Sequence, residues 1–115
     1  MACAVALKNL EVIEKAGLVP RVKTSIGPYL QRRLTETFAD HPLVGEVRGQ
    51  GLLAAVELVR DRTERKFFPD PGTVGTLCRN YCFDDGLVCR AIRDTMVLAP
   101  PLVVSKARST RWSRN

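Results

Sequence analysis

Two arginines and an aspartate near the end of the chain are the residues best suited to chemistry. Segment 86–105, GLVCRAIRDTMVLAPPLVVS, contains two apolar runs, Leu87–Cys89 and Met96–Pro101. The polar link between these runs carries Arg90, Arg93 and Asp94. A guanidinium can form two parallel hydrogen bonds to a carboxylate, so an arginine at the lip of a pocket can clamp an anion. The pattern is equally typical of a solvated hairpin turn, and the residues alone leave both interpretations open.

The cysteines and the single histidine do not predict a metal site. Cys78 and Cys82 stand four residues apart with Cys89 beyond, a pattern that lacks the paired close spacings of structural zinc sites. His41 directly precedes a proline and has no partner at a metal-ligand spacing. Nothing indicates an oxidising compartment, so we expect ordinary buried or half-buried thiols, Cys3 included, and no disulfide framework.

The glycine-rich segment 48–51, RGQG, is a weak phosphate-loop candidate. A phosphate loop needs its glycines between a strand and the start of a helix, where backbone N–H groups converge on the anion. Here a second strand-like run follows the glycines. We therefore expect a glycine bend or bulge that lets the strand change direction.

The net charge of +6 comes mainly from the last ten residues. Segment 106–115, KARSTRWSRN, holds four basic residues and no acid, which leaves +2 for residues 1–105. A short basic tail with Trp112 does not by itself predict a nucleic-acid-binding protein, because the sequence contains no recognisable motif for base recognition. It does leave open a non-catalytic interaction module in which the basic tail sets the partners.

Length and composition fit one modest globular domain. The chain has 115 residues, of which 45% are apolar and 26% charged. Its apolar runs are too short for a membrane-spanning helix, and residues 1–8 lack the basic leader and apolar stretch of a secretion signal. The default expectation is a cytoplasmic protein.

The N-terminal half predicts two amphipathic helices, each with an apolar face that needs a partner surface. Segment 2–16 has apolar residues at helical spacing, and Gly17 is suited to the left-handed residue that ends a helix. A second helix begins near Pro20, with apolar residues every four positions as far as Phe38. Gly27-Pro28 should distort it, because proline removes a backbone hydrogen bond.

The remainder predicts strands around one further helix. Segment 43–59 is a strand pair broken by glycines. Its second half, 52–59, has small or apolar residues on both faces, so we expect both faces to be covered. A charged loop at 60–71, a helix at 72–83 and the hairpin of the opening segment follow. The prediction is an α+β fold, with helices on a small antiparallel or mixed sheet.

Three segments together resemble class III (omega-type) pyridoxal-phosphate-dependent aminotransferases. They are ACAVALKNLEVIEKAGLV, HPLVGEVRGQGLLAAVELV and GLVCRAIRDTMVLAPPLVVS, in the order and at the separations of that family's C-terminal part. The resemblance covers roughly residues 2–106. It rests most on VRGQGL at 47–52 and on APPL at 99–102.

The resemblance implies a small C-terminal domain at 18–105, with residues 1–17 as the helix that leads out of a larger domain. It implies that Arg90 lies at the active-site mouth, engages a substrate carboxylate, and swings away on a flexible link for an apolar amine donor. Such enzymes move an amino group from an amine or amino acid to a keto acid or aldehyde, and the resemblance implies a homodimer.

The chemistry of the family requires a lysine bound to pyridoxal phosphate, and the resemblance implies that this lysine lies in the larger domain. Lys8, Lys15 and Lys23 fall on exposed helix faces, so none is assigned that role and no catalytic or cofactor-binding residue is identified here. We therefore expect these 115 residues alone to be inactive. The alternative is a non-catalytic remnant.

The tail, 106–115, departs from the family pattern, which continues into an acidic amphipathic helix. An abrupt change to Arg, Ser and Trp is what a shift of reading frame would produce, so we expect this segment not to be family sequence. Loss of that helix would expose apolar surface, and a few hundred Å² at about 25 cal/mol per Å² rivals a small domain's stability. We expect a marginally stable chain.

Overall fold

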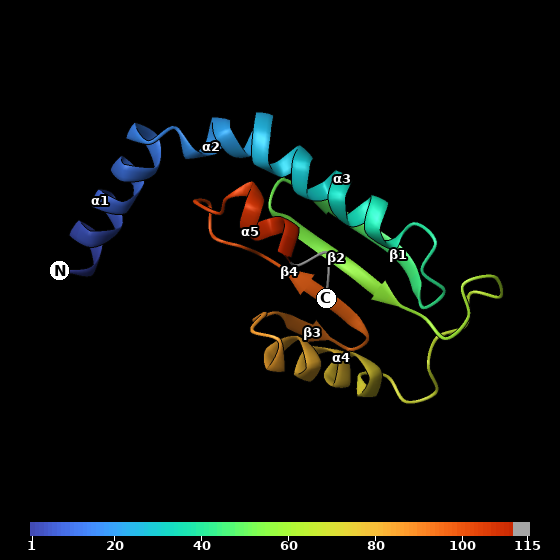
Figure 1. Cartoon of the computed structure of the whole chain (residues 1–115). Helices are drawn as coiled ribbons and strands as arrows, with labels where there is room; N and C mark the ends of the chain where they lie inside the picture. The colour runs from blue at the N-terminus through green and yellow to red at the C-terminus, as the bar shows by residue number, and fades with distance from the viewer. Residues whose placement is uncertain (112–115) are drawn as a thin grey trace.

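A four-stranded antiparallel sheet, in the order β1-β2-β4-β3, carries helices on one of its faces (Figure 1). The computed structural model describes residues 1–111. The strands are β1 (Val44–Gln50), β2 (Leu53–Leu58), β3 (Arg90–Ile92) and β4 (Thr95–Leu98). The helices are α1 (Ala2–Lys15), α2 (Leu18–Arg21), α3 (Gly27–Phe38), α4 (Thr73–Asp84) and α5 (Lys106–Arg111). The predicted α+β class is confirmed, and the sheet is antiparallel.

The two faces of the sheet differ in how they are covered. Along β2, Ala54 and Val56 are buried against the helices, as the alternation of the sequence predicts. Leu53, on the opposite face, remains 59% exposed. Ala55 and Glu57 on this face are half-buried, and the loop at 67–71 lies beside them. The second face is therefore only partly covered within residues 1–111, less than the sequence predicts.

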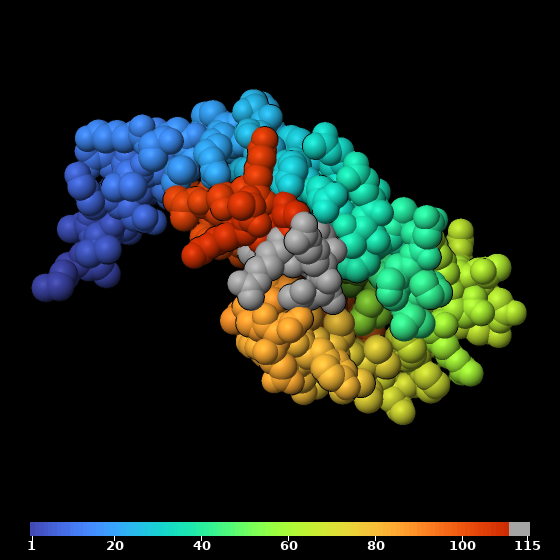
Figure 2. Space-filling view, viewed as in Figure 1, coloured from blue at the N-terminus to red at the C-terminus, as the bar shows by residue number. Residues whose placement is uncertain are grey.

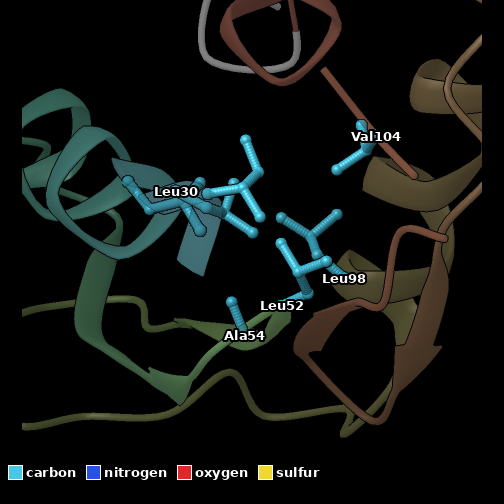
Figure 3. Packing of buried hydrophobic residues seen from close by; sticks show 7 residues of the cluster. Leu30, Leu52, Ala54, Leu98 and Val104 are labelled. Carbon is cyan, nitrogen blue, oxygen red and sulfur yellow. The ribbon is translucent and has the colours of Figure 1, made fainter. Parts of the chain in front are cut away.

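The main core lies between α3 and the covered face of the sheet. Leu30 and Leu34 project from α3 and are almost completely buried. In Figure 3 the side chains of Leu52, Ala54, Leu98 and Val104 converge on Leu30. These residues come from the β1–β2 turn, from β2, from β4 and from the segment after APPL, so one cluster holds the distant parts of the fold together.

Helix α1 extends away from this body as an arm (Figure 2). Gly17 has a φ of 59° and ends the helix as predicted. No residue of α1 is buried, and Leu7 and Leu10 are 68% and 56% exposed. The radius of gyration of 16.3 Å exceeds the roughly 13 Å expected for a compact chain of this length. The apolar face of α1 therefore has no partner within residues 1–111.

The long second helix is irregular where the sequence predicts a distortion. One turn of π-helix (η1, Val22–Ile26) separates α2 from α3 and ends directly before Gly27-Pro28. A Cβ on Gly27 would lie 2.4 Å from the carbonyl oxygen of Val22 and 2.9 Å from Cα of Gly51. Glycine at this position lets the helix approach the turn between β1 and β2.

The predicted helix at 72–83 is confirmed as α4, which begins after Gly72. Helix α5 falls within the predicted basic tail and was not expected as a helix. Residues 112–115, including Trp112 and Arg114, lie outside the described residues. Among residues 1–111 there is no helix with the length and apolar character needed to cross a membrane.

Candidate functional site

Arg90 lies on the edge strand of the sheet. It is the first residue of β3 and stands opposite Val97 of β4. Because Ala91 packs on the core, Arg90 and Ile92 point to the uncovered face of the sheet. The sequence placed Arg90 in the polar link of the hairpin, and this is wrong. Strand pairing begins at Arg90, and Arg93 and Asp94 alone form the link.

The hairpin link is fixed to the start of α4. The buried carboxylate of Asp94 accepts hydrogen bonds from the backbone N–H groups of Gly72, at 3.0 Å, and Gly75, at 2.8 Å. A Cβ on Gly75 would lie only 2.0 Å from the carbonyl oxygen of Arg93. These contacts anchor the hairpin link beside Arg90 to the first turn of α4.

Arg90 is free to bind an anion, in contrast to Arg48 on the same face. Within residues 1–111, no hydrogen bond or ion pair engages the guanidinium of Arg90. Arg48 lies 3.1 Å from Glu57 and 3.0 Å from Glu46, and the hydrogen bond to Glu57 is the main reason that its pKa is raised. Glu46 and Glu57 already compensate the charge of Arg48. An anionic ligand should therefore bind to Arg90 in preference to Arg48.

A hollow of about 560 Å³ lies on the uncovered face of the sheet. Val97, the neighbour of Arg90 across the hairpin, and Ile92 contribute to its wall, and Arg93 and Phe67 also line it. The hollow is largely apolar, and its charged lining residues are Arg48, Glu57, Arg93 and Asp94. An apolar ligand with one carboxylate could lie against this surface and reach an arginine of the β3–β4 hairpin.

The RGQG segment serves packing. A Cβ on Gly49 would lie 2.3 Å from the carbonyl oxygen of Leu53, and Gly51 has a φ of 59° in the turn to β2. The side-chain amide of Gln31, on α3, donates to the carbonyls of Gly51, at 3.1 Å, and Leu53, at 3.2 Å. The glycine turn predicted from the sequence is confirmed, because a strand and not a helix follows it.

The segment after β4 is held by an arginine that sequence reasoning missed. Arg21, in α2, donates to the carbonyl oxygens of Leu102, at 2.7 Å, and Val104, at 2.6 Å. Its position directly after Pro20 gives no signal of this role, because its two acceptors lie more than 80 residues away. Arg21 thereby positions the APPL segment, which follows the strand paired with β3.

The cysteines are free thiols, and the histidine contacts the backbone of a neighbouring residue. Cys3 is exposed, whereas Cys78, Cys82 and Cys89 are partly buried and all are free thiols. The ring Nδ1 of His41 accepts the N–H of Leu43 at 3.3 Å. No group of three or more His, Cys, Asp or Glu residues within residues 1–111 has a geometry that could hold a metal ion.

The lysines do not fit the role of a cofactor-binding residue. All five are exposed, and none lines the hollow beside the hairpin. Lys8 and Lys15 both pair with Glu11 on α1, at 2.8 Å and 2.5 Å. A lysine that forms a Schiff base is commonly activated by desolvation or by a cationic neighbour, whereas these five lysines are exposed to solvent.

Helix α5 places the first part of the basic tail on the body of the fold. The hydroxyl groups of Tyr29 and Thr110 lie 2.6 Å apart, and the Lys106 ammonium lies 5.4 Å from the Tyr29 ring centroid. Ser109 is buried. Helix α5 is thus packed on α3 through Lys106, Ser109 and Thr110.

Comparison with known proteins agrees with this architecture. Residues 1–113 match the family described as Aminotransferase class-III. The chain is 48% identical over 108 residues to the putrescine–pyruvate aminotransferase of Pseudomonas aeruginosa, covering 94% of this chain and 23% of the relative. It is 38% identical to the diaminobutyrate–2-oxoglutarate transaminase of Halomonas elongata, again covering 23% of the relative and 92% of this chain.

Solved structures show the same relationship. The omega transaminase of Pseudomonas jessenii in complex with PMP superposes with a TM-score of 0.88 at 40% identity, covering 96% of this chain and 24% of that one. A transaminase with L-ala superposes with a TM-score of 0.92, also at 40% identity, covering 98% of this chain and 26% of that one. The chain thus spans about a quarter of the length of the relatives it matches. On sequence and fold alike, it belongs to the class III aminotransferases.

Proposed function

We propose that this chain serves as the small-domain part of a pyridoxal-phosphate-dependent transaminase. Such an enzyme moves an amino group between an amine or amino acid and a keto acid or aldehyde. The support is the match of residues 1–113 to the family, and relatives described as acting on putrescine with pyruvate or on diaminobutyrate with 2-oxoglutarate. Residues 18–105 form the small domain, and residues 1–17 form the connecting helix.

Arg90 binds the carboxylate of the substrate in this proposal. The observation that carries it is an exposed guanidinium on the edge strand that makes no hydrogen bond or ion pair within residues 1–111. Arg90 does not itself line the apolar hollow, but its cross-strand neighbour Val97 does. Two parallel hydrogen bonds from a guanidinium recognise a planar carboxylate, and a lysine cannot reproduce this fork. With an amine that lacks a carboxylate, the side chain rotates towards solvent and leaves the apolar surface to the substrate.

Catalysis requires groups beyond these residues. The cofactor, when bound, accepts and releases the amino group, and a lysine must hold it. The five lysines of this chain are exposed and do not fit that role. The 115 residues alone therefore do not catalyse transamination, and they contribute substrate recognition to a larger assembly.

The unpartnered surfaces favour such an assembly. Val5 and Leu10 on α1, and Leu53 and Ile92 on the open face of the sheet, are all more than half exposed. Apolar faces of this kind are buried in stable proteins. We propose that the cofactor-binding large domain of the enzyme covers them, and that the complete enzyme is a homodimer.

A chimera tests the role of Arg90. Residues 1–111 replace the matching quarter of the P. aeruginosa putrescine–pyruvate aminotransferase, and kcat and KM are measured with pyruvate and with an aldehyde acceptor of similar size. Removing the arginine from a solvent-exposed arginine–carboxylate pair costs about 2–3 kcal/mol, or roughly 30- to 150-fold in kcat/KM. We expect Arg90→Leu to lose this factor with pyruvate and to change little with the aldehyde.

Two further variants sharpen the result. Arg90→Lys keeps the charge and should recover only a small part of the activity with pyruvate. Arg93→Asn is the matched control, because asparagine tolerates the φ of 53° at this position. Equal losses with both acceptors for Arg90→Leu, or a pyruvate-specific loss for Arg93→Asn instead, would overturn the assignment.

A further inference from the structure

Helix α4 packs against β3 (Figure 1). Three of the four cysteines, Cys78, Cys82 and Cys89, come from α4 and from the residue before β3, and they belong to one cluster. The thiol of Cys82 is close enough to the thiols of Cys78 and Cys89 to contribute, after burial, to the raised pKa of each. All three side chains pack against one group of buried residues, which consists of Val44, Val56 and Met96. Cys3, the fourth cysteine, is exposed on the arm formed by α1. The fold therefore brings together thiols that the sequence spacing does not link.

The two possible pairs differ in geometry. Cys78 and Cys82 stand four residues apart on α4, where Cβ atoms lie about 5–6 Å from each other. A disulfide requires about 3.5–4.5 Å between Cβ atoms, so this pair would distort the helix. Cys89 approaches Cys82 from a different segment, and the N–H of Leu87 donates to the carbonyl oxygen of Cys82 at 2.7 Å, which holds that segment in place. Geometry thus favours the pair of Cys82 and Cys89.

Cys82 is also the thiol of this pair that faces solvent space. A surface hollow of about 400 Å³ is lined by Cys78, Tyr81 and Cys82, and Cys89 does not contribute to it. A small oxidant in this hollow reaches Cys82, as well as Cys78, more readily than Cys89. Cys89 then supplies the second thiol of the pair.

We propose that Cys82 and Cys89 form an intramolecular disulfide when the chain meets a peroxide, which makes this cluster an oxidative modification site. The Cys82 sulfur attacks one peroxide oxygen, the O–O bond breaks, and a sulfenic acid and one water form. The Cys89 sulfur then displaces the sulfenic oxygen, which leaves as a second water while the S–S bond forms. Two thiols are oxidised and one peroxide is reduced, and an external thiol reverses the reaction.

The location of this bond links it to the β3–β4 hairpin. Cys89 directly precedes Arg90, so the disulfide would fasten the first residue of β3 to the last turn of α4. Formation of the bond rests only on the thiol cluster. Its effect on substrate binding rests in addition on the role proposed for Arg90.

The test uses the full chain with Cys3→Ser, which removes disulfides between chains. The protein is treated with hydrogen peroxide in native buffer and in urea, alkylated, digested without reduction, and mapped by mass spectrometry. We expect the native protein to lose two of its three titratable thiols and to become about 2 Da lighter, with a linked peptide pair that contains Cys82 and Cys89. Burial is the main reason that the pKa of Cys89 is raised, to about 12, so the second step should accelerate as the pH rises.

Variants separate the specific pair from general oxidation. Cys78→Ser should leave the disulfide in place, whereas Cys82→Ser and Cys89→Ser should each abolish it. Oxidation that joins Cys78 to Cys82, yields only sulfinic acid, or gives the same distribution of pairs in native buffer as in urea would overturn the proposal. Because peptide mapping of the unmutated pair carries the result, instability of a serine variant does not obscure it.

Discussion

Gly75→Ala should destabilise this protein, although the same change stabilises most helices. Gly75 lies inside α4, where alanine is favoured over glycine by about 1 kcal/mol. In this fold, however, a Cβ at position 75 would lie 2.0 Å from the carbonyl oxygen of Arg93 and 2.9 Å from Cα of Asp94. Both atoms belong to the backbone, so no side-chain rotation relieves the collision and the helix must move away from the hairpin.

The magnitude follows from the contacts that this movement breaks. Overpacking costs about 1–3 kcal/mol. Displacement also breaks at least one hydrogen bond to the buried carboxylate of Asp94, which costs a further ~1.5–3 kcal/mol. After the gain in helix propensity, the net loss is about 1.5–5 kcal/mol. For a domain of this size the unfolding midpoint should fall by at least about 6 °C.

Thermal unfolding followed by far-UV circular dichroism measures this change. Thr76→Ala is the matched control, because Thr76 is exposed on the same turn of α4 and alanine there should raise the midpoint slightly. The double variant Gly75→Ala/Asp94→Asn should lose less than the sum of the single losses, since both changes act on one contact. A Gly75→Ala protein as stable as the wild type would refute the close packing of α4 on the hairpin.

Other perturbations give further expected outcomes. Arg21→Met should lower the free energy of unfolding by about 1–3 kcal/mol and speed proteolysis within residues 99–105, because the carbonyls of Leu102 and Val104 lose their charged donor. The control Lys23→Met changes an exposed residue nearby and should have neither effect. The pKa of Cys89 is raised to about 12, mainly by burial and secondarily by the neighbouring thiols. The protonated thiol therefore contributes fully to the stability of the fold below about pH 8.5, the pKa of an unfolded cysteine, and this contribution is lost as the pH rises towards 12. When the pH is raised from about 8 to about 10.5, the thermal unfolding midpoint should therefore decrease more for the wild type than for Cys89→Ser. Equal decreases in the two proteins would contradict this expectation. The wild-type chain itself should unfold below about 60 °C, and a sharp reversible transition above that temperature would show that its open apolar faces cost little.

The elements with a clear period could be predicted from the sequence. The alternation through Ala54 and Val56 predicts the buried face of β2, and the four-residue spacing through Leu30 and Leu34 predicts the buried face of α3. Gly17 marks the end of α1, because a left-handed residue is needed there. These features depend on local patterns, which the sequence contains in full.

The parts that depend on tertiary contacts could not be predicted. Arg90 belongs to β3 because it pairs with Val97, a contact that the apolar run before it does not reveal. Arg21 and Asp94 find their partners about 80 and 20 residues away. Small and apolar residues on the second face of the sheet indicate that this face is covered. They do not reveal whether the covering element lies within these 115 residues or elsewhere.

The chimera of residues 1–111 with the large domain of the P. aeruginosa relative tests the central claim most directly, through its bound cofactor. The protein is purified with pyridoxal phosphate, and its visible spectrum and its transamination of putrescine with pyruvate are compared with those of the 115-residue chain. We predict that the chimera shows the absorbance of lysine-bound cofactor and turns over, while the chain alone does neither. A folded chimera that binds cofactor but has no activity, or a chain that is active alone, would contradict the claim that these residues form the substrate-recognising small domain of a transaminase.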